Sequence, residues 1–457
     1  MLHNWSAPNG YRDVLRIGLP MVMSMASNTL MQFTDRVFLA NHSVEAIAAA
    51  LPAGITSFLF VSLFMGVTSY ASVFIAQYVG AGSRRRVGAA LWQGLYFAAG
   101  ASLLMAGLYF VAGPIFDAAG HPPEVRVQEI AYFRVMCLGA FATLLSVALG
   151  NFFTGRGRTR PLMVANFIGA ALNIPLDYVM IFGAGPVPSM GVVGAAWASV
   201  IGQTFIGLML AALTFTAKND RRMGVWRNRA FDAELFGRLM RFGLPGGVHF
   251  FLNMFAVTFF IFMIGRLGKI ELAATNIALS IDMLAFLPMI GFSVAVSVMV
   301  GQAIGSGRPD DAAKATSSTI RLTLSWMSLV LVCFMLFPRQ IIGLFLVSGQ
   351  SAAESRAILE MGVVFLRWVA VYSLFDGVGI IYTGAIKGAG DTAYVMKVIA
   401  VMAVVAMIAP VWFLVEVLRA EAYLVWAVLT FYVCALGLLM WLRYRGGKWR
   451  EMRVIEN

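Results

Sequence analysis

Charged residues are scarce in this sequence, and acidic residues are scarcer than basic ones. Only 12% of the 457 residues are charged, about half the share found in soluble domains. There are 22 Asp and Glu residues, against 34 Lys and Arg, and only 4 His. This composition excludes an ordinary soluble globular domain with a charged surface.

Cysteine is also sparse. The three cysteines, Cys137, Cys333 and Cys434, are far apart, and each lies inside an apolar run. The pattern indicates neither a disulfide framework nor a structural metal site, and we expect the cysteines to act as small hydrophobic residues. The sequence has no Walker-type phosphate loop and no nucleophile elbow, so we expect neither an enzyme nor a bound cofactor.

Apolar residues, in contrast, make up 60% of the chain, and the mean hydropathy is +0.81. A helix needs about 20 apolar residues to cross the hydrocarbon core of a membrane. The sequence therefore predicts an all-α integral membrane protein with twelve transmembrane helices. The expected spans are residues 14–39, 50–78, 88–113, 130–152, 162–182 and 191–216, and then 239–264, 273–303, 321–345, 358–384, 393–416 and 422–443.

Short motifs of the first half return in the second half. In the same order, residues 16–20 (RIGLP) return as 241–245 (RFGLP), the QxxGxG pattern of 77–82 returns at 302–307, and the GxGxT of 155–159 returns at 388–392. This repetition indicates two homologous six-helix units. Because six spans per copy leave both copies pointing the same way, we expect a pseudo-two-fold axis along the membrane normal.

The repeat sets the expected domains. We predict an amino-terminal lobe over residues 1–217, a polar, arginine-rich cytoplasmic linker over 218–238, and a carboxy-terminal lobe over 239–457 with a basic tail. Internal duplication of this kind is common in secondary transporters.

The basic residues predict the orientation. Of the 34 Lys and Arg residues, 25 fall on one side of the expected spans and 9 on the other. The positive-inside rule then places both termini in the cytoplasm. The net charge of +12 could suggest a nucleic-acid partner, but its location in short loops between apolar runs argues against one. We expect membrane lipid as a partner instead: the basic tail either serves only as a topology anchor or lies against anionic lipid.

Four aspartates lie inside the expected spans: Asp35, Asp177, Asp282 and Asp376. An aspartate at the centre of a membrane helix costs about 2.5–3.5 kcal/mol on insertion scales. Such residues either reach water near a helix end or line an ion or substrate pathway. Both alternatives are open for each of the four.

Asp177 has the strongest local context. Asn173 lies one helical turn earlier, on the same face, and Pro175 between them predicts a bent helix with freed backbone carbonyls. Asp35, which follows Thr34 in another apolar span, could complete a site for a proton or a small hard cation.

The second half carries its polar residues in a different pattern. Tyr372 and Asp376 are four residues apart on one helix face, as are His249 and Asn253. The histidine could be a packing group or a proton relay, with Asp376 or Asp282 as its partner. Of the 27 Met and 35 Phe residues, we expect most to face lipid or fill the packing, and some could line a cavity for flat organic cations.

Taken together, these motifs resemble a known family. The matching segments are residues 18–20 (GLP) with Asp35, 77–82, 173–177 (NIPLD), 191–196 (GVVGAA), 243–245 (GLP), and Asp376 ahead of 384–388 (GAIKG). Over essentially its full length, the chain resembles a bacterial multidrug and toxic compound extrusion (MATE) transporter of the NorM-like or DinF-like type. The resemblance implies two six-helix lobes in a V shape in the bacterial inner membrane.

The resemblance also implies a function. Such transporters export small organic cations and other xenobiotics by antiport with H⁺ or Na⁺. Asp35, Asn173 and Asp177 match the family's amino-lobe cation site, a possible Na⁺ site, and Ser199 falls near a helping hydroxyl. Asp376 matches a carboxylate of the NorM-like branch, which pairs it with a glutamate where this chain has Asn253. Here Asp376 could instead bind substrate, or work with another group of the second half. We expect a monomer.

One alternative transport function remains. A lipid-linked oligosaccharide or lipid flippase of the same superfamily fold would need cationic residues in its cavity, and Arg134 and Arg367 lie within expected spans. The predominance of acidic residues in the spans favours a cationic cargo. Organic-cation efflux or lipid translocation in reconstituted vesicles would separate the two.

Overall fold

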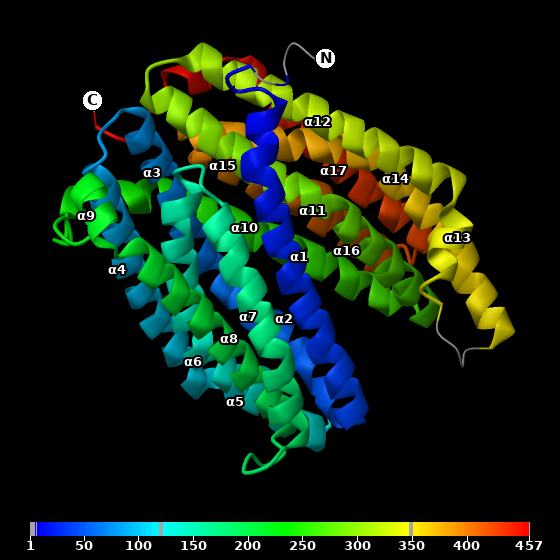
Figure 1. Ribbon diagram of the computed structural model, residues 1–457. Coiled ribbons are helices and arrows are strands. Elements are labelled where there is room, and N and C mark those ends of the chain that lie inside the picture. The colour runs from blue at the N-terminus through cyan, green and yellow to red at the C-terminus, as the bar shows by residue number, and fades with distance from the viewer. Residues whose placement is uncertain (1–4, 6, 118–121, 347–350, 457) are drawn as a thin grey trace. The chain divides into compact units, whose positions relative to one another are not determined.

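The computed structural model describes residues 5, 7–117, 122–346 and 351–456, and these are almost wholly helical (Figure 1). Over the described ranges, the only β-structure is one isolated bridge between Ala184 and Val187. The predicted all-helical membrane fold is confirmed. Eleven helices of the described chain are long and apolar enough to cross a membrane. The first long helix, α1 (Tyr11–His42), is not among them, because polar residues such as Ser24, Asn28 and Gln32 interrupt its apolar sequence.

The chain divides into two compact units. We call Pro20–Phe251, Gly305–Gly307 and Val454–Asn457 the amino-terminal unit. Met1–Leu19, Leu252–Ile304 and Arg308–Arg453 form the carboxy-terminal unit. Helices α1 and α10 (Ala233–Leu267) are therefore divided between the units. The lobes expected from the sequence, 1–217 and 239–457, stay a prediction.

The amino-terminal unit is a bundle centred on one long helix. It consists of α2 (Val44–Ser69), α3 (Ala71–Gly80), α4 (Arg86–Gly107), α5 (Ala112–Asp117), α6 (Pro123–Thr154), α7 (Arg160–Phe182), α8 (Gly191–Thr214), α9 (Ala217–Met223) and parts of α1 and α10. Helix α6 packs against α2, α4 and α8, and α7 packs along α8. The backbones of α2 and α10 approach closely at two glycines: a Cβ at Gly66 would lie 2.6 Å from the Cα of Gly247.

The carboxy-terminal unit is built in the same way. It consists of α11 (Lys269–Gly305), α12 (Pro309–Leu336), α13 (Pro338–Gly343), α14 (Ala352–Ala389), α15 (Thr392–Met402), α16 (Ala409–Trp412), α17 (Ala422–Arg445) and parts of α1 and α10. Two π-helical segments, Ala403–Ile408 and Phe413–Val417, flank α16. Helix α14 packs against α12 and α17, and Phe365 stacks on Trp426 with ring centroids 4.6 Å apart.

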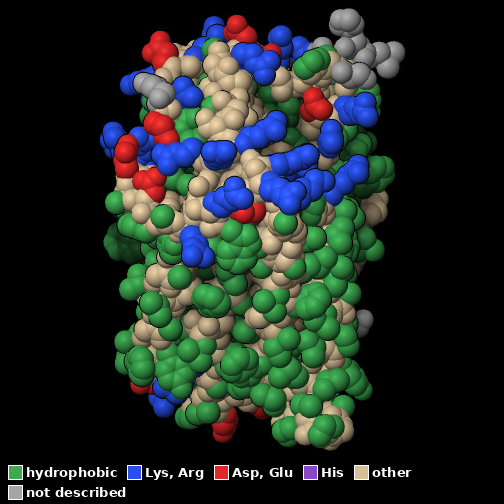
Figure 2. All heavy atoms as spheres, turned by 60° about the vertical axis from the view of Figure 1, so that its left-hand side comes forward, with side chains coloured by type: hydrophobic (Ala, Val, Ile, Leu, Met, Phe, Trp, Pro, Cys, Tyr) green, Lys and Arg blue, Asp and Glu red, His purple; other side chains and the backbone are tan. Residues whose placement is uncertain are grey.

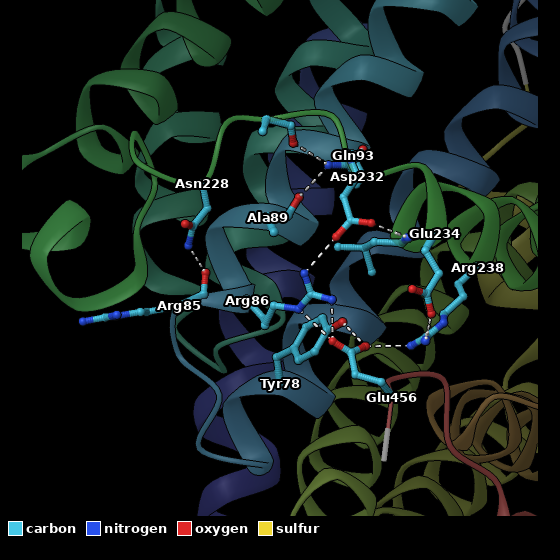
Figure 3. Close-up of polar contacts among 12 residues, drawn as sticks. Tyr78, Arg85, Arg86, Ala89, Gln93, Asn228, Asp232, Glu234, Arg238 and Glu456 are labelled. Carbon is cyan, nitrogen blue, oxygen red and sulfur yellow. Dashed lines mark hydrogen bonds and ion pairs between the residues drawn. The ribbon is translucent and has the colours of Figure 1, made fainter.

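The polar connection after α8 is packed rather than extended. Helix α9 contacts α4, and the indole N–H of Trp92 donates to the carbonyl of Val225 at 2.6 Å. Val225 is fully buried, and the side chain of Asn228 donates to the carbonyl of Arg85 (Figure 3). Residues 218–232 thus belong to the bundle end, and α10 begins at Ala233, inside the linker expected over 218–238.

The last described residues are anchored in the amino-terminal unit. Val454 and Ile455 are 2% and 6% exposed and belong to a hydrophobic cluster with residues of α3, α4 and α10, among them Phe74 and Leu239. The backbone N–H of Val454 donates to Oε1 of Gln77 at 2.9 Å. The repeated glutamine of the first half is therefore a fixed acceptor for the end of the chain.

Glu456 completes this anchor (Figure 3). Its carboxylate accepts hydrogen bonds from the Tyr78 hydroxyl at 2.7 Å, the Arg86 guanidinium at 2.7 Å and the Arg238 guanidinium at 2.6 Å. Arg86 also pairs with Asp232 at 2.8 Å. Burial alone would raise the pKa of Glu456, but the hydrogen bonds and the Arg86 charge outweigh it and lower the pKa to about 2.

Basic side chains gather at one end of the molecular face shown in Figure 2, above a broad hydrophobic surface. In the amino-terminal unit, exposed arginines lie between α3 and α4 and between α8 and α10: Arg84, Arg85, Arg221, Arg222, Arg227 and Arg229. This segregation of charge from an apolar belt is typical of a membrane protein.

Candidate functional site

The first group of predicted site residues comes together in the amino-terminal unit. Asp35 of α1 and Asp177 of α7 lie with their carboxyl groups within hydrogen-bonding reach of each other. The hydroxyl of Ser199, on α8, donates to Oδ2 of Asp35 at 3.3 Å. Asn173 lies one turn before Asp177 on α7. The consecutive helices α7 and α8 and the distant α1 thus supply one polar cluster.

This cluster is buried, and most of its polar atoms make no hydrogen bond among the described residues. Asn173 and Asp177 are 0% exposed. Both carboxylate oxygens of Asp177, the amide oxygen and nitrogen of Asn173, and Oδ1 of Asp35 make no hydrogen bond within the described chain. Two ionised carboxylates are both acceptors, so their contact becomes a hydrogen bond only when one carries a proton. An unpaired buried polar group costs about 1–3 kcal/mol, and the arrangement favours a proton or a cation between the two aspartates.

Local sequence explains the close approach of α7 and α8. Gly202 lies three residues after Ser199, on the same face of α8, and a Cβ there would lie 3.3 Å from the Cβ of Asn173. Pro175 lies inside α7, which nevertheless runs unbroken from Arg160 to Phe182. The glycine lets α8 place its serine hydroxyl against the acids.

Sequence reasoning missed two neighbours of this cluster. Tyr132 of α6 lies near enough to Asp35 and Asp177 to interact electrostatically with both; its position in an apolar span was the available signal. Asn166 donates to the Ser24 hydroxyl at 2.7 Å, linking α7 to α1. Because Asn166 lies two turns before Asn173, helical spacing alone could have placed it on the same face.

The second group of predicted residues lies in the carboxy-terminal unit. The Tyr372 hydroxyl, on α14, donates to Oδ2 of Asp282, on α11, at 2.9 Å. Asp376, one turn after Tyr372, interacts electrostatically with Asp282. Tyr432 of α17 lies near Asp376, and its buried hydroxyl has no hydrogen-bond partner among the described residues. Two acids and two phenols therefore gather between three helices.

The remaining pair, His249 and Asn253, is half-buried on α10. The division of this helix assigns His249 to the amino-terminal unit and Asn253 to the carboxy-terminal unit. Within the described ranges, no three His, Cys, Asp or Glu side chains lie close enough to hold a metal ion.

A family model, MatE, matches residues 20–179 and 245–412, which is more than two thirds of the chain. The chain belongs to the MatE family. As a member it is a multi-pass membrane transporter, and the two matched segments correspond to the two halves of the sequence repeat. The resemblance drawn from the short motifs is confirmed.

Named relatives cover most of this MatE chain. It is 26% identical over 390 residues to the multidrug resistance protein NorM of Aliivibrio fischeri, covering 84% of this chain and 82% of that protein. It is 28% identical over 392 residues to a probable multidrug resistance protein NorM of Xanthomonas campestris pv. campestris, covering 82% and 81%.

Solved structures share its fold. A MOP superfamily transporter from Pyrococcus furiosus superposes with a TM-score of 0.87 at 21% identity over 97% of both chains. An outward-facing multidrug resistance MATE family transporter of the MOP superfamily gives a TM-score of 0.85 at 22% identity, again over 97% of both chains. At this identity the likeness concerns the fold alone.

Proposed function

We propose that this protein is a secondary active exporter of small organic cations and other xenobiotics, driven by antiport with H⁺ or Na⁺. One observation carries the proposal: Asp35 and Asp177 contact each other inside a membrane bundle, and both oxygens of Asp177 and Oδ1 of Asp35 accept no hydrogen bond from the described residues. The names of the two NorM relatives, both described as multidrug resistance proteins, support the substrate class.

The coupling chemistry follows from this geometry. Two carboxylates in contact cannot both stay ionised without a compensating positive charge. A proton shared between Asp35 and Asp177 supplies that charge, and so does Na⁺, a hard cation that prefers oxygen ligands such as those of Asp177, Asn173 and Ser199. Export requires only that the ion-loaded and the substrate-loaded forms prefer different arrangements of the protein. Each charge moved across 100 mV then supplies about 2.3 kcal/mol.

The carboxy-terminal acids have a different role in this proposal. Asp282 and Asp376 lie beside Tyr372 and Tyr432, a combination of negative charge and aromatic faces that suits an organic cation. The NorM-like branch pairs its carboxylate with a glutamate, and this chain has Asn253 there. We therefore assign these acids to substrate rather than to the coupling ion.

Orientation and location are part of the same proposal. The concentration of arginines at one end, above an apolar belt (Figure 2), supports a bacterial inner-membrane protein whose basic end and both termini face the cytoplasm.

The deciding experiment uses proteoliposomes loaded with a fluorescent organic cation, under a pH gradient and a Na⁺ gradient applied separately. The wild type is expected to transport under one of them, and D35N and D177N to lose that transport. D117N, which removes an exposed aspartate paired with Arg126, is the matched control. Gradient-driven export at the wild-type rate by D35N would refute the coupling site.

The flippase alternative predicts lipid translocation instead, with no cation export under either gradient. Its cationic cavity finds little support in Arg134 and Arg367. Arg134 donates to the carbonyl of Tyr109 at 3.3 Å and lies 4.8 Å from the centre of its ring. Arg367 is exposed on α14.

A further inference from the structure

A cavity of about 450 Å³ lies in the carboxy-terminal unit between α12, α14, α17 and the 3-10 turn Lys448–Glu451. Its lining combines guanidinium groups, a hydroxyl and aromatic rings. They include Arg321, Arg445, Arg450, Ser317, Trp441 and Tyr444. The transport cycle proposed above uses none of these residues.

The cavity is strongly positive. Arg450 pairs with Asp310 at 3.2 Å, but Asp310 is largely exposed. Arg321 and Arg445 have no carboxylate within ion-pair distance in the described part of the chain, and both are exposed. Two unpaired guanidinium groups that line one cavity repel each other, and an anion between them relieves that repulsion. Guanidinium binds phosphate oxygens in a two-pronged geometry, which makes phosphate the best-matched anion.

The walls of the cavity hold their positions through ring contacts. Tyr444 and Trp449 stack with centroids 4.8 Å apart and planes 11° from parallel. The Trp449 indole N–H donates to the Tyr444 carbonyl at 2.9 Å, and its side chain is 2% exposed. The Arg445 guanidinium lies 5.3 Å from the centre of the Trp441 ring. The chain end after α17 is thus folded back into a preformed wall.

Apolar surface continues from this basic cavity toward the middle of the spans. Arg445 ends the candidate span Ala422–Arg445, and Leu438, two turns earlier, is 50% exposed. Leu324, one turn after Arg321 on α12, is 38% exposed. Both leucines lie on the membrane side of their arginine. A soluble phosphate has no apolar part that could contact this surface, whereas the acyl chains of a lipid would cover it.

We propose that this cavity binds the headgroup phosphate of an anionic phospholipid, with Arg321 and Arg445 as its principal ligands. Ser317 offers a hydroxyl to the headgroup, and the acyl chains run along Leu324 and Leu438. The site is independent of the coupling ion and of the exported substrate. It fixes the end of α17 at the membrane interface.

The test measures binding of fluorescent phosphatidylglycerol, and of matched phosphatidylcholine, to the full-length protein in neutral detergent micelles. Each basic residue near an anionic membrane contributes about 1 kcal/mol, or about fivefold in affinity. R321Q/R445Q should therefore bind phosphatidylglycerol at least tenfold more weakly and phosphatidylcholine unchanged. R321Q alone, which breaks no ion pair, should lose about fivefold if the double variant folds poorly. R321K/R445K should keep most of the affinity.

The matched control is R84Q/R85Q, which removes two exposed arginines of the amino-terminal unit that likewise have no acidic partner among the described residues. Equal weakening in this control would reduce the effect to general charge and overturn the site. Competition by inorganic phosphate as effective as that by unlabelled phosphatidylglycerol would identify a free-anion site and would also overturn it. Loss confined to R321Q/R445Q, displaced by lipid and not by phosphate, is the expected result.

Discussion

Two polar clusters of the amino-terminal unit differ in how their carboxylates are compensated. Around Glu456, two guanidinium groups and a phenol donate to one carboxylate (Figure 3). Around Asp177, two carboxylates meet with one serine hydroxyl and an amide that makes no hydrogen bond in the described chain. The first cluster is complete as it stands. In the second, the Arg36 charge acts on Asp35, but three carboxylate oxygens accept no hydrogen bond from the described residues, which favours a bound proton or cation.

The difference separates stability from function. A partly buried carboxylate with charged donors stabilises the folded state, whereas buried unpaired carboxylates destabilise it unless something binds to them. The residues around Asp177 reduce stability, yet they lie together on three helices. Such residues are candidates for a functional site. Substitutions around Asp177 should therefore reduce export, whereas substitutions around Glu456 should reduce the stability of the folded state.

The largest effect is expected from D177N. The amide keeps the shape of the side chain but can no longer exchange a proton or bind Na⁺ as an anion, so coupled export should fall about 100-fold or more. Its melting temperature should stay equal or rise, because a buried unpaired charge has been removed. Gradient-driven export from proteoliposomes tests the first expectation, and thermal unfolding of the same preparation tests the second. A folded D177N variant that exports at the wild-type rate would show that Asp177 has no role in coupling.

The next effect is expected from E456Q and runs the opposite way. Glutamine cannot accept charge-assisted hydrogen bonds from both Arg86 and Arg238, so the folded state should lose about 1–2 kcal/mol, after allowance for the partial exposure of the carboxylate. Export per folded molecule should be unchanged. E451Q, at an exposed residue of the same tail, is the control and should melt like the wild type. A loss of export by E456Q without a fall in melting temperature would contradict the structural role.

Acid should erase the difference between E456Q and the wild type. The pKa of Glu456 is lowered from its ordinary 4.5 to about 2. Its stabilisation is therefore complete above about pH 4.5 and is lost as the pH falls toward 2, where the folded state also takes up the proton. Asp232 has a lowered pKa for a similar reason, a hydrogen bond from the Leu235 backbone and its contact with Arg86, but it is present in both proteins. Melting curves of the two proteins should converge with acidification; a constant gap would show that Glu456 contributes no ion pair.

These clusters also mark how far the sequence could predict the structure. Helical periodicity and the cost of charge in a membrane were enough to select Asp35, Asp177 and Asn173, because those arguments need no tertiary contact. Their convergence depends on how α1, α7 and α8 pack, which local spacing does not encode. The ordered set of short motifs, with residues 18–20 and 173–177 among them, indicated the family, and with it the fold.

The Glu456 cluster could not have been foreseen. Glu456 is 378 residues from Tyr78 in the chain, and a short polar tail after the last span gives no sign that it will be buried. The same holds for the packing around Val225. The polar sequence of 218–238 predicted a cytoplasmic linker and gave no sign that one of its side chains is buried. In both cases the deciding information is a long-range contact.

The smallest effect is expected from S199A. This variant removes the long hydrogen bond from Ser199 to Asp35. Among the described residues, the Ser199 hydroxyl donates to Asp35, and at 3.3 Å that bond is long, worth about 1 kcal/mol or less. Export should therefore fall about fivefold at most, with the larger effect at low driving force, when ion binding is limiting. S102A removes a buried hydroxyl that bonds only within its own helix, to the carbonyl of Ala98, and should export normally. If S199A matched D177N in severity, the hydroxyl would be a direct ligand of the coupling ion, which Na⁺ can use and a shared proton does not need; a mild effect favours the proton.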